Sequence, residues 1–204
     1  MDNVWVNGIV YRLNHKHKTA TIVKVEEVYP VIVIPDKVMT NYAEYAVIGI
    51  ESAVFYKLDL QQIYLPPTMK KIGNNAFCGC TKLEKIMCDN VECVQIGQLA
   101  FTGCHSLMVV QFSGEVSVAK NCFYNCRNIR QIILRAIGKI EGSTFNSCKN
   151  LHEIHFTSPK QLIIEPNAIL GCENLEEIKI HGSVIDNAGI LDLAYEGISV
   201  SVGI

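Results

Sequence analysis

The chain has 204 residues, of which 49% are hydrophobic and 19% are charged, a composition typical of folded proteins and not of disordered ones. No apolar run reaches the roughly 18 residues that a membrane helix needs. The formal net charge of -2 gives no electrostatic reason to expect nucleic acid or an anionic membrane as a partner. The first residues, MDNVWVNGIVYRL, contain no basic segment followed by an apolar one, so no secretory signal is visible. From these residues alone, the protein either stays inside the cell or has lost a leader.

Residues 1–48 differ from the rest of the chain and are expected to form an N-terminal β-hairpin cap. Apolar residues alternate loosely from Val4 to Leu13 and again from Ala20 to Val25, with the basic segment HKHK (residues 15–18) between them. This pattern predicts a β-hairpin with a polar tip. The β-branched run from Val31 to Pro35 predicts a third strand that ends at the proline. A cap is expected because the first coil of a repeat stack would otherwise expose its apolar interior.

Residues 49–182 are periodic. Five segments follow the pattern I-x-x-x-A-F-x-x-C-x-x-L-x-x-I, with at most three substitutions each, and they begin at Ile72, Ile96, Val118, Ile140 and Ile164. Their starts are 24, 22, 22 and 24 residues apart, a period typical of leucine-rich repeats, in which each unit adds one strand to a stacked solenoid. A degenerate copy precedes them, with Ala53 at the alanine position and Lys57 where the cysteine is expected.

The repeat pattern predicts the fold class. The A-F-x-x-C segment has the spacing of a short helical turn, and the L-x-x-I segment that follows has the spacing of a strand. We therefore predict an α/β fold, a right-handed β/α superhelix of leucine-rich repeats with about six coils. The core is expected to contain a vertical stack of one large apolar residue from each coil: Phe77, Phe101, Phe123, Phe145 and then Ile169.

The nine cysteines also follow the repeat. Five of them hold the same repeat position and are expected to form a buried ladder: Cys80, Cys104, Cys126, Cys148 and Cys172. Cys122 and Cys88 are also expected to point inward, whereas Cys78 and Cys93 are irregular. The number of cysteines is odd, and most of their positions are set by the repeat. Both facts favour reduced thiols over a disulfide framework. Their CxC, Cx4C and Cx3C spacings do not combine into a tetrahedral zinc pattern.

The predicted strands define an exposed sheet face. Side chains alternate along a strand, so the residues between the inward-facing ones must point outward. One outward file is predicted to contain Tyr64, Met87, Gln111, Ile133, His155 and Lys179, and the files beside it contain Val109 and Arg135. These residues are the candidate binding surface. The alternative is an ordinary soluble β surface, because scattered exposed apolar residues need no functional explanation.

After His181 the repeat pattern ends. Residues 183–204 are expected to form a C-terminal cap, and the alternation of Ile198, Val200, Val202 and Ile204 favours a last strand there.

The repeat resembles that of a known family. The unit I-x-x-x-A-F-x-x-C-x-x-L-x-x-I looks like the BspA-type (Treponema pallidum type) leucine-rich repeat, and the N-terminal segments NGIVYRL, ATIVKV, VIVIP and YAVIGIESAVF are similar to the start of such arrays. The resemblance covers the chain from about Val4 to His181. It implies a binding module of bacterial surfaces that adheres to host extracellular proteins, and therefore a secreted or cell-surface location.

No catalytic motif is visible in the sequence. The patterns GxGxxG, Walker A, HExxH and GxSxG are absent. His152, Glu153 and His155 form only HExH, and a strand would place the two histidines on opposite faces. The HKH segment at residues 15–17 is expected to be a hairpin tip. We therefore predict no enzyme activity, no cofactor and no metal site.

These observations lead to two hypotheses for function. The first is a non-catalytic binding module that recognises a protein or glycan through the sheet face, in bacterial surface adhesion. The alternative is a structural spacer or scaffold domain, in which the sheet face has no binding role. The sequence predicts neither the identity of the partner nor the oligomeric state.

Overall fold

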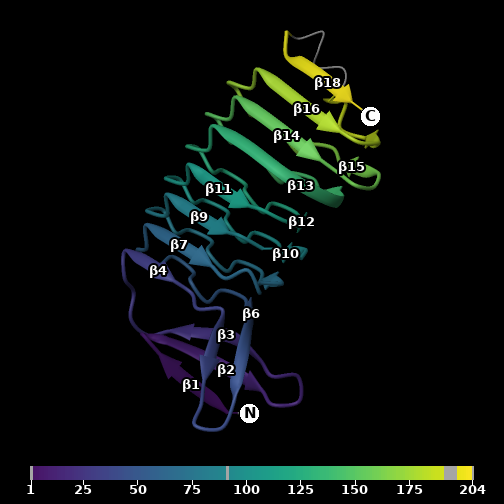
Figure 1. The fold of residues 1–204 in the computed structure, drawn as a ribbon. Helices are drawn as coiled ribbons and strands as arrows, with labels where there is room; N and C mark the ends of the chain where they lie inside the picture. The colour runs from purple at the N-terminus through teal and green to yellow at the C-terminus, as the bar shows by residue number, and fades with distance from the viewer. Residues whose placement is uncertain (1, 91, 191–196, 204) are drawn as a thin grey trace.

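The computed structural model describes residues 2–90, 92–190 and 197–203. It is an elongated stack of short strands, with the N-terminal strands at one end and β18 at the other (Figure 1). Within the described residues it contains strands and turns but no helix.

The N-terminal end is built from two antiparallel hairpins. β1 (Asn3–Val6) pairs with β2 (Ile9–Asn14), and β2 pairs with β3 (Thr19–Val25) around the HKHK tip. We expected the alternation from Val4 to Leu13 to belong to one strand, but Asn7 and Gly8 interrupt it with φ angles of 49° and 77°. An Asn-Gly pair with both residues at positive φ matches a type I′ turn, so this dipeptide was the missed signal.

β3 connects the hairpins to the stack by parallel pairing with β6 (Glu44–Ile50), to which β5 (Lys37–Met39) adds an antiparallel strand. The division into a cap of residues 1–48, a solenoid of 49–182 and a C-terminal cap of 183–204 stays a prediction.

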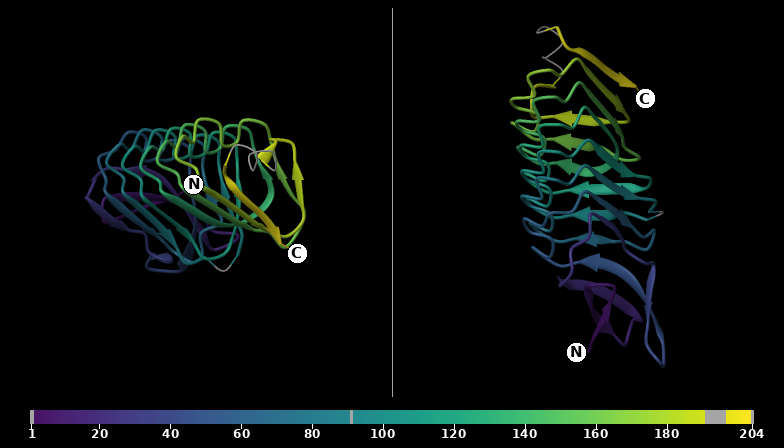
Figure 2. Two further views of the ribbon diagram at one scale, coloured as in Figure 1. Left: turned by 90° about the horizontal axis from the view of Figure 1, so that it is seen from above. Right: turned by 90° about the vertical axis from the view of Figure 1, so that its left-hand side faces the viewer.

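Each coil of the stack carries two strand positions. The first forms the outer face, and its strands are β4 (Val31–Val33), β7 (Gln62–Leu65), β9 (Lys85–Cys88), β11 (Val109–Phe112), β13 (Gln131–Ile140), β14 (Glu153–Thr157), β16 (Glu177–His181) and β18 (Ser199–Gly203). The second position holds the end of β6, followed by β8 (Lys71–Ile72), β10 (Val94–Ile96), β12 (Glu115–Val118), β15 (Leu162–Ile164) and β17 (Val184–Asp186). β13 is long enough to serve both positions, since it pairs with β14 through its first half and with β12 and β15 through its second. A column of turns closes the third side of the stack (Figure 2).

The predicted α/β superhelix is wrong, because the chain forms an essentially all-β solenoid. The segments expected to be helical turns contain two residues per coil in the left-handed region, four positions apart, such as Asn75 (φ 55°) with Gly79 (φ 74°), and Asn121 (φ 57°) with Asn125 (φ 59°). A right-handed helix cannot contain such residues without breaking. Asn and Gly tolerate this region best, so their spacing of four was the sequence signal for turns.

Hydrogen bonds between coils explain why the turns replace a helix. The backbone N–H of Phe77 donates to the carbonyl of Ala100 at 2.8 Å, and that of Gly79 donates to the carbonyl of Thr102 at 2.8 Å, each in the next coil. The intervening N–H of Cys78 closes a local turn on the carbonyl of Asn75 at 3.1 Å. The backbone groups are thus satisfied by stacking, a source of hydrogen bonds that an isolated segment lacks.

The prediction of about six coils was also too low, because the solenoid has about eight turns. β4 is paired with β7 in the outer sheet, although we placed it in the hairpin cap. At the other end β18 pairs with β16, so Val200 and Val202 of the predicted alternation lie in a last strand, and Ile198 precedes it. Ile204, the fourth residue of that alternation, lies outside the described residues.

The predicted phenylalanine stack runs through the core. Ring centroids of successive residues Phe77, Phe101, Phe123 and Phe145 lie 5.1 to 5.5 Å apart, with interplanar angles of 4° to 6°. Phe55 begins the stack, 4.8 Å from Phe77. This corrects the alignment of the first coil, in which we placed Lys57 at the cysteine position. The 22-residue offset from Phe55 to Phe77 also relates Ile50 to Ile72, which pair in β6 and β8.

The cysteine ladder lies beside the phenylalanines. Each thiol donates to the backbone carbonyl of the phenylalanine one coil earlier, as Cys104 does to Phe77 at 3.1 Å and Cys126 to Phe101 at 3.0 Å. All nine cysteines are free, and Cys88 and Cys122 are buried as expected. Desolvation by burial raises the pKa of the Cys80 thiol to about 12 and that of Cys88 to about 11. These thiols therefore act as small apolar residues with a weak donor.

Candidate binding surface

The outer strands bring the predicted outward file together in two registered groups. Tyr64 lies opposite Met87, and Met87 lies opposite Gln111, across β7, β9 and β11. Ile133 lies opposite His155, and His155 opposite Lys179, across β13, β14 and β16. The first group belongs to a four-stranded sheet and the second to the larger sheet, and Figure 1 shows β13 following β11 along the same side of the stack. These residues share one face because side chains alternate along each strand and the strands occupy the same position in successive coils.

Val109 and Arg135 lie in the files on either side. Val109 is in register with Lys85, and Arg135 is in register with Thr157. Arg135 also forms an ion pair with Glu115 at 3.3 Å, between two half-exposed side chains, so its guanidinium is turned toward β12, the second strand of the preceding coil. Whether any of these eight residues binds a partner stays a prediction.

The N-terminal half of the outer face is apolar and amphipathic. Ile133 is 53% exposed and Val109 is 40% exposed, and the half-buried Tyr64 and Met87 lie in the coils before them. The Tyr64 hydroxyl donates to Gln62 at 3.0 Å, and the ammonium of Lys85 lies 5.3 Å from the centre of the Tyr64 ring. These contacts restrain the aromatic ring before a partner binds, so less side-chain entropy is lost on binding.

The C-terminal half of the outer face is charged. Lys179 pairs with Glu177 at 2.6 Å, and the His155 Nε2 atom lies 3.6 Å from a carboxylate oxygen of Glu177 and 3.9 Å from one of Glu153. The hydrogen bond from Lys179 is the main cause that lowers the pKa of Glu177, which keeps this carboxylate ionised. The face therefore changes from apolar to charged along the stack.

Val33 is an outer-face residue that we missed. It lies opposite Tyr64 in β4, and its side chain is 69% exposed. Val31, on the same strand, is 48% exposed. The signal was present in the sequence, because the segments VIVIP and IYLPP share one pattern. In both, two apolar residues with one outward residue between them precede a proline. We assigned VIVIP to the cap because β4 has no A-F-x-x-C segment before it.

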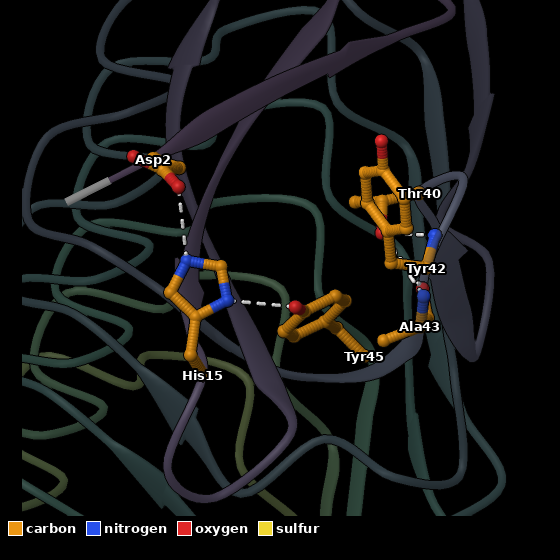
Figure 3. A network of polar contacts seen from close by, with 6 residues as sticks. All are labelled: Asp2, His15, Thr40, Tyr42, Ala43 and Tyr45. Atoms are coloured by element: carbon orange, nitrogen blue, oxygen red, sulfur yellow. Dashed lines mark hydrogen bonds and ion pairs between the residues drawn. The ribbon is translucent and has the colours of Figure 1, made fainter.

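A separate polar network lies in the N-terminal hairpins (Figure 3). The two ring nitrogens of His15 contact the hydroxyl of Tyr45 at 2.7 Å and a carboxylate oxygen of Asp2 at 3.1 Å. Nearby, the hydroxyl of Thr40 accepts hydrogen bonds from the backbone N–H groups of Tyr42 and Ala43. The His15 contacts join the tip between β2 and β3 to Tyr45 of β6 and to Asp2, whereas the Thr40 contacts close the turn between β5 and β6.

Comparison with known proteins identifies the repeat. Residues 92–188 match the BspA type leucine rich repeat region in six copies. These residues form a BspA-type leucine-rich repeat region. The matched region includes β10 to β17, so the N-terminal hairpins and the first coils of this repeat protein lie outside it.

Two solved structures are similar to this chain. A leucine-rich repeat protein of T. pallidum aligns over 100% of both chains, with 20% identity and a TM-score of 0.69. A leucine-rich repeat protein of Bacteroides ovatus aligns with 98% of this chain and 76% of its own, with 19% identity and a TM-score of 0.48. At these identities the likeness concerns the fold. A comparison with curated proteins finds no significant match.

Two further findings bear on the function. Leucine-rich repeat proteins are generally used for binding, and the similar proteins are described as repeat proteins and not as enzymes. Among the described residues, no helix is long and apolar enough to cross a membrane.

Proposed function

We propose that this BspA-type repeat protein is a non-catalytic binding module that recognises a protein or glycan through its outer sheet face, in adhesion at a bacterial surface. The observation that carries the proposal is the group of apolar side chains on neighbouring outer strands, in which Val33, Val109 and Ile133 are exposed and Tyr64 and Met87 are half-buried. Exposed apolar residues that gather on one face favour an interaction site over an ordinary soluble surface.

The rigidity of the stack supports this proposal. The outer strands are hydrogen-bonded to their neighbours in register, as in the pairing of β7 with β9 and of β9 with β11. Their side chains are therefore held in place before a partner arrives, and less ordering entropy is lost on binding. Adhesion itself rests on the resemblance of the repeat to surface adhesins.

Capture of extracellular matrix proteins, mucins and glycans by the purified chain tests the proposal. Replacing Tyr64 and Ile133 by Glu places two charges in the apolar part of the outer face, and we expect this double variant to lose capture at least tenfold. Because both side chains project outward, the substitutions should leave the fold intact, which circular dichroism checks.

A matched control carries Tyr124→Glu and Leu170→Glu. These residues are also one aromatic and one aliphatic side chain, 39% and 58% exposed, but they lie in the turn segments between the strands. Capture that survives in the control and is lost in the outer-face variant supports the proposal. Capture that both variants retain favours the spacer or scaffold alternative, in which other parts of the molecule make the contacts.

A further inference from the structure

Three side chains that could bind a metal converge on the outer face. Glu153 and His155 lie two residues apart on β14 and therefore point to the same side, and Glu177 lies opposite Glu153 on β16. One ligand atom from each of the three, an imidazole nitrogen and two carboxylate oxygens, lies within 4.8 Å of the others. The HExH segment by itself did not predict this cluster, because the third ligand, Glu177, comes from the next coil.

The imidazole of His155 is the second observation. Its Nε2 atom is inaccessible to solvent and has no hydrogen-bond partner among the described residues. The two carboxylate oxygens flank it at 3.6 and 3.9 Å, beyond the usual length of a hydrogen bond. Buried polar atoms are nearly always satisfied, and this nitrogen faces two carboxylates at ion-pair distance, an arrangement that a shared cation would satisfy.

We propose that Glu153, His155 and Glu177 bind a divalent transition-metal ion, with Zn²⁺ the best match. Bond lengths of about 2.0 to 2.2 Å in a tetrahedral zinc site place neighbouring ligand atoms about 3.3 to 3.5 Å apart. The separations of 3.6 and 3.9 Å in this cluster are therefore close to what an ion requires. Two carboxylates and a neutral imidazole also balance the charge of the ion.

The surroundings of the cluster determine how tightly the ion is held. The Gln131 amide donates to Glu153 at 2.5 Å and orients that carboxylate, as partners of metal ligands commonly do. The Lys179 ammonium lies 2.6 Å from a Glu177 oxygen and competes with the ion for it. Lys179 must turn away on its flexible chain when the ion binds.

Three protein ligands leave at least one coordination position open. Because the cluster lies on the outer face, this position is available to a donor atom from outside the chain. The metal site does not depend on the proposed binding function, since the ion can be measured without any partner.

Titration of the metal-free chain, prepared without a histidine tag, with Zn²⁺ in a calorimeter tests this inference, and the absorption of bound Co²⁺ reports the ligand geometry. We expect one site of micromolar affinity. His155→Asn and Glu177→Gln should each weaken it at least about tenfold, the lower bound known for partners that only support metal ligands. Lys179→Gln should strengthen it by up to about fivefold, the factor that corresponds to an exposed ion pair.

His181→Asn is the matched control, because His181 lies on β16 on the same face and is exposed. It should leave Zn²⁺ affinity unchanged. The inference is overturned if the wild-type chain shows no saturable site, if His155→Asn binds as well as the wild type, or if His181→Asn weakens binding equally. Failure of partner capture by the outer-face variants would not affect this result, so the two proposals fail separately.

Discussion

Phe101 shows, at the scale of single residues, how strongly each coil depends on its core residue. It is fully buried, with Phe77 on one side at 5.1 Å and Phe123 on the other at 5.2 Å. Phe101→Ala should lower the free energy of unfolding by about 3 to 5 kcal/mol, because it leaves a cavity that the rings on either side cannot fill. Urea denaturation measures the loss. Phe101→Leu, which keeps most of the volume, should cost clearly less, and equal losses for the two variants would contradict the stacked core.

The turn segments carry a prediction at the scale of an element. Leu99 adopts φ 58° and Asn121 adopts φ 57° at the equivalent position of successive coils. Left-handed conformations cost residues other than Gly and Asn roughly 1 to 2 kcal/mol. Leu99→Asn should therefore stabilise the protein by up to about 1 kcal/mol, and the reciprocal change Asn121→Leu should destabilise it. Thermal denaturation of both variants tests this, and shifts of the same sign would show that side-chain packing outweighs the backbone term.

The buried thiols give the whole molecule a dependence on alkaline pH. Burial raises the pKa of the Cys80, Cys88 and Cys172 thiols from 9.0 to about 12, 11 and 12, respectively. Below about pH 9 the thiols are neutral in both states, so their contribution to stability is constant. As pH rises through the interval between the two pKa values, only the unfolded chain releases these protons, and stability falls by about 1.4 kcal/mol per thiol and pH unit.

Urea midpoints measured between about pH 8 and pH 11 test this dependence. Cys80→Ala removes one buried thiol without adding an ionisable group, so its stability should fall less steeply with pH than that of the wild type. Identical slopes would mean that the thiol is already ionised or exposed in the folded chain.

The sequence alone determined which residues share a position in the stack. A repeat of 22 to 24 residues returns each side chain to the same direction, so the phenylalanines, the ladder cysteines and the outward file from Tyr64 to Lys179 could all be predicted from their spacing. This kind of inference needs only the period of the repeat and the alternation of side chains along a strand.

The tertiary structure decided the features that the spacing of residues in the sequence does not determine, namely the turn conformation and the contacts between coils. Whether A-F-x-x-C forms a helical turn or an extended turn depends on hydrogen bonds to the next coil, such as that from Phe77 to Ala100, which no single segment contains. The position of β4 in the outer sheet likewise depends on its pairing with β7. The approach of Glu177 to His155 requires the exact register of two coils, because residues 22 apart meet only when every intervening turn has closed. Contacts between coils are set by the stacking of the whole chain, and local sequence does not encode them.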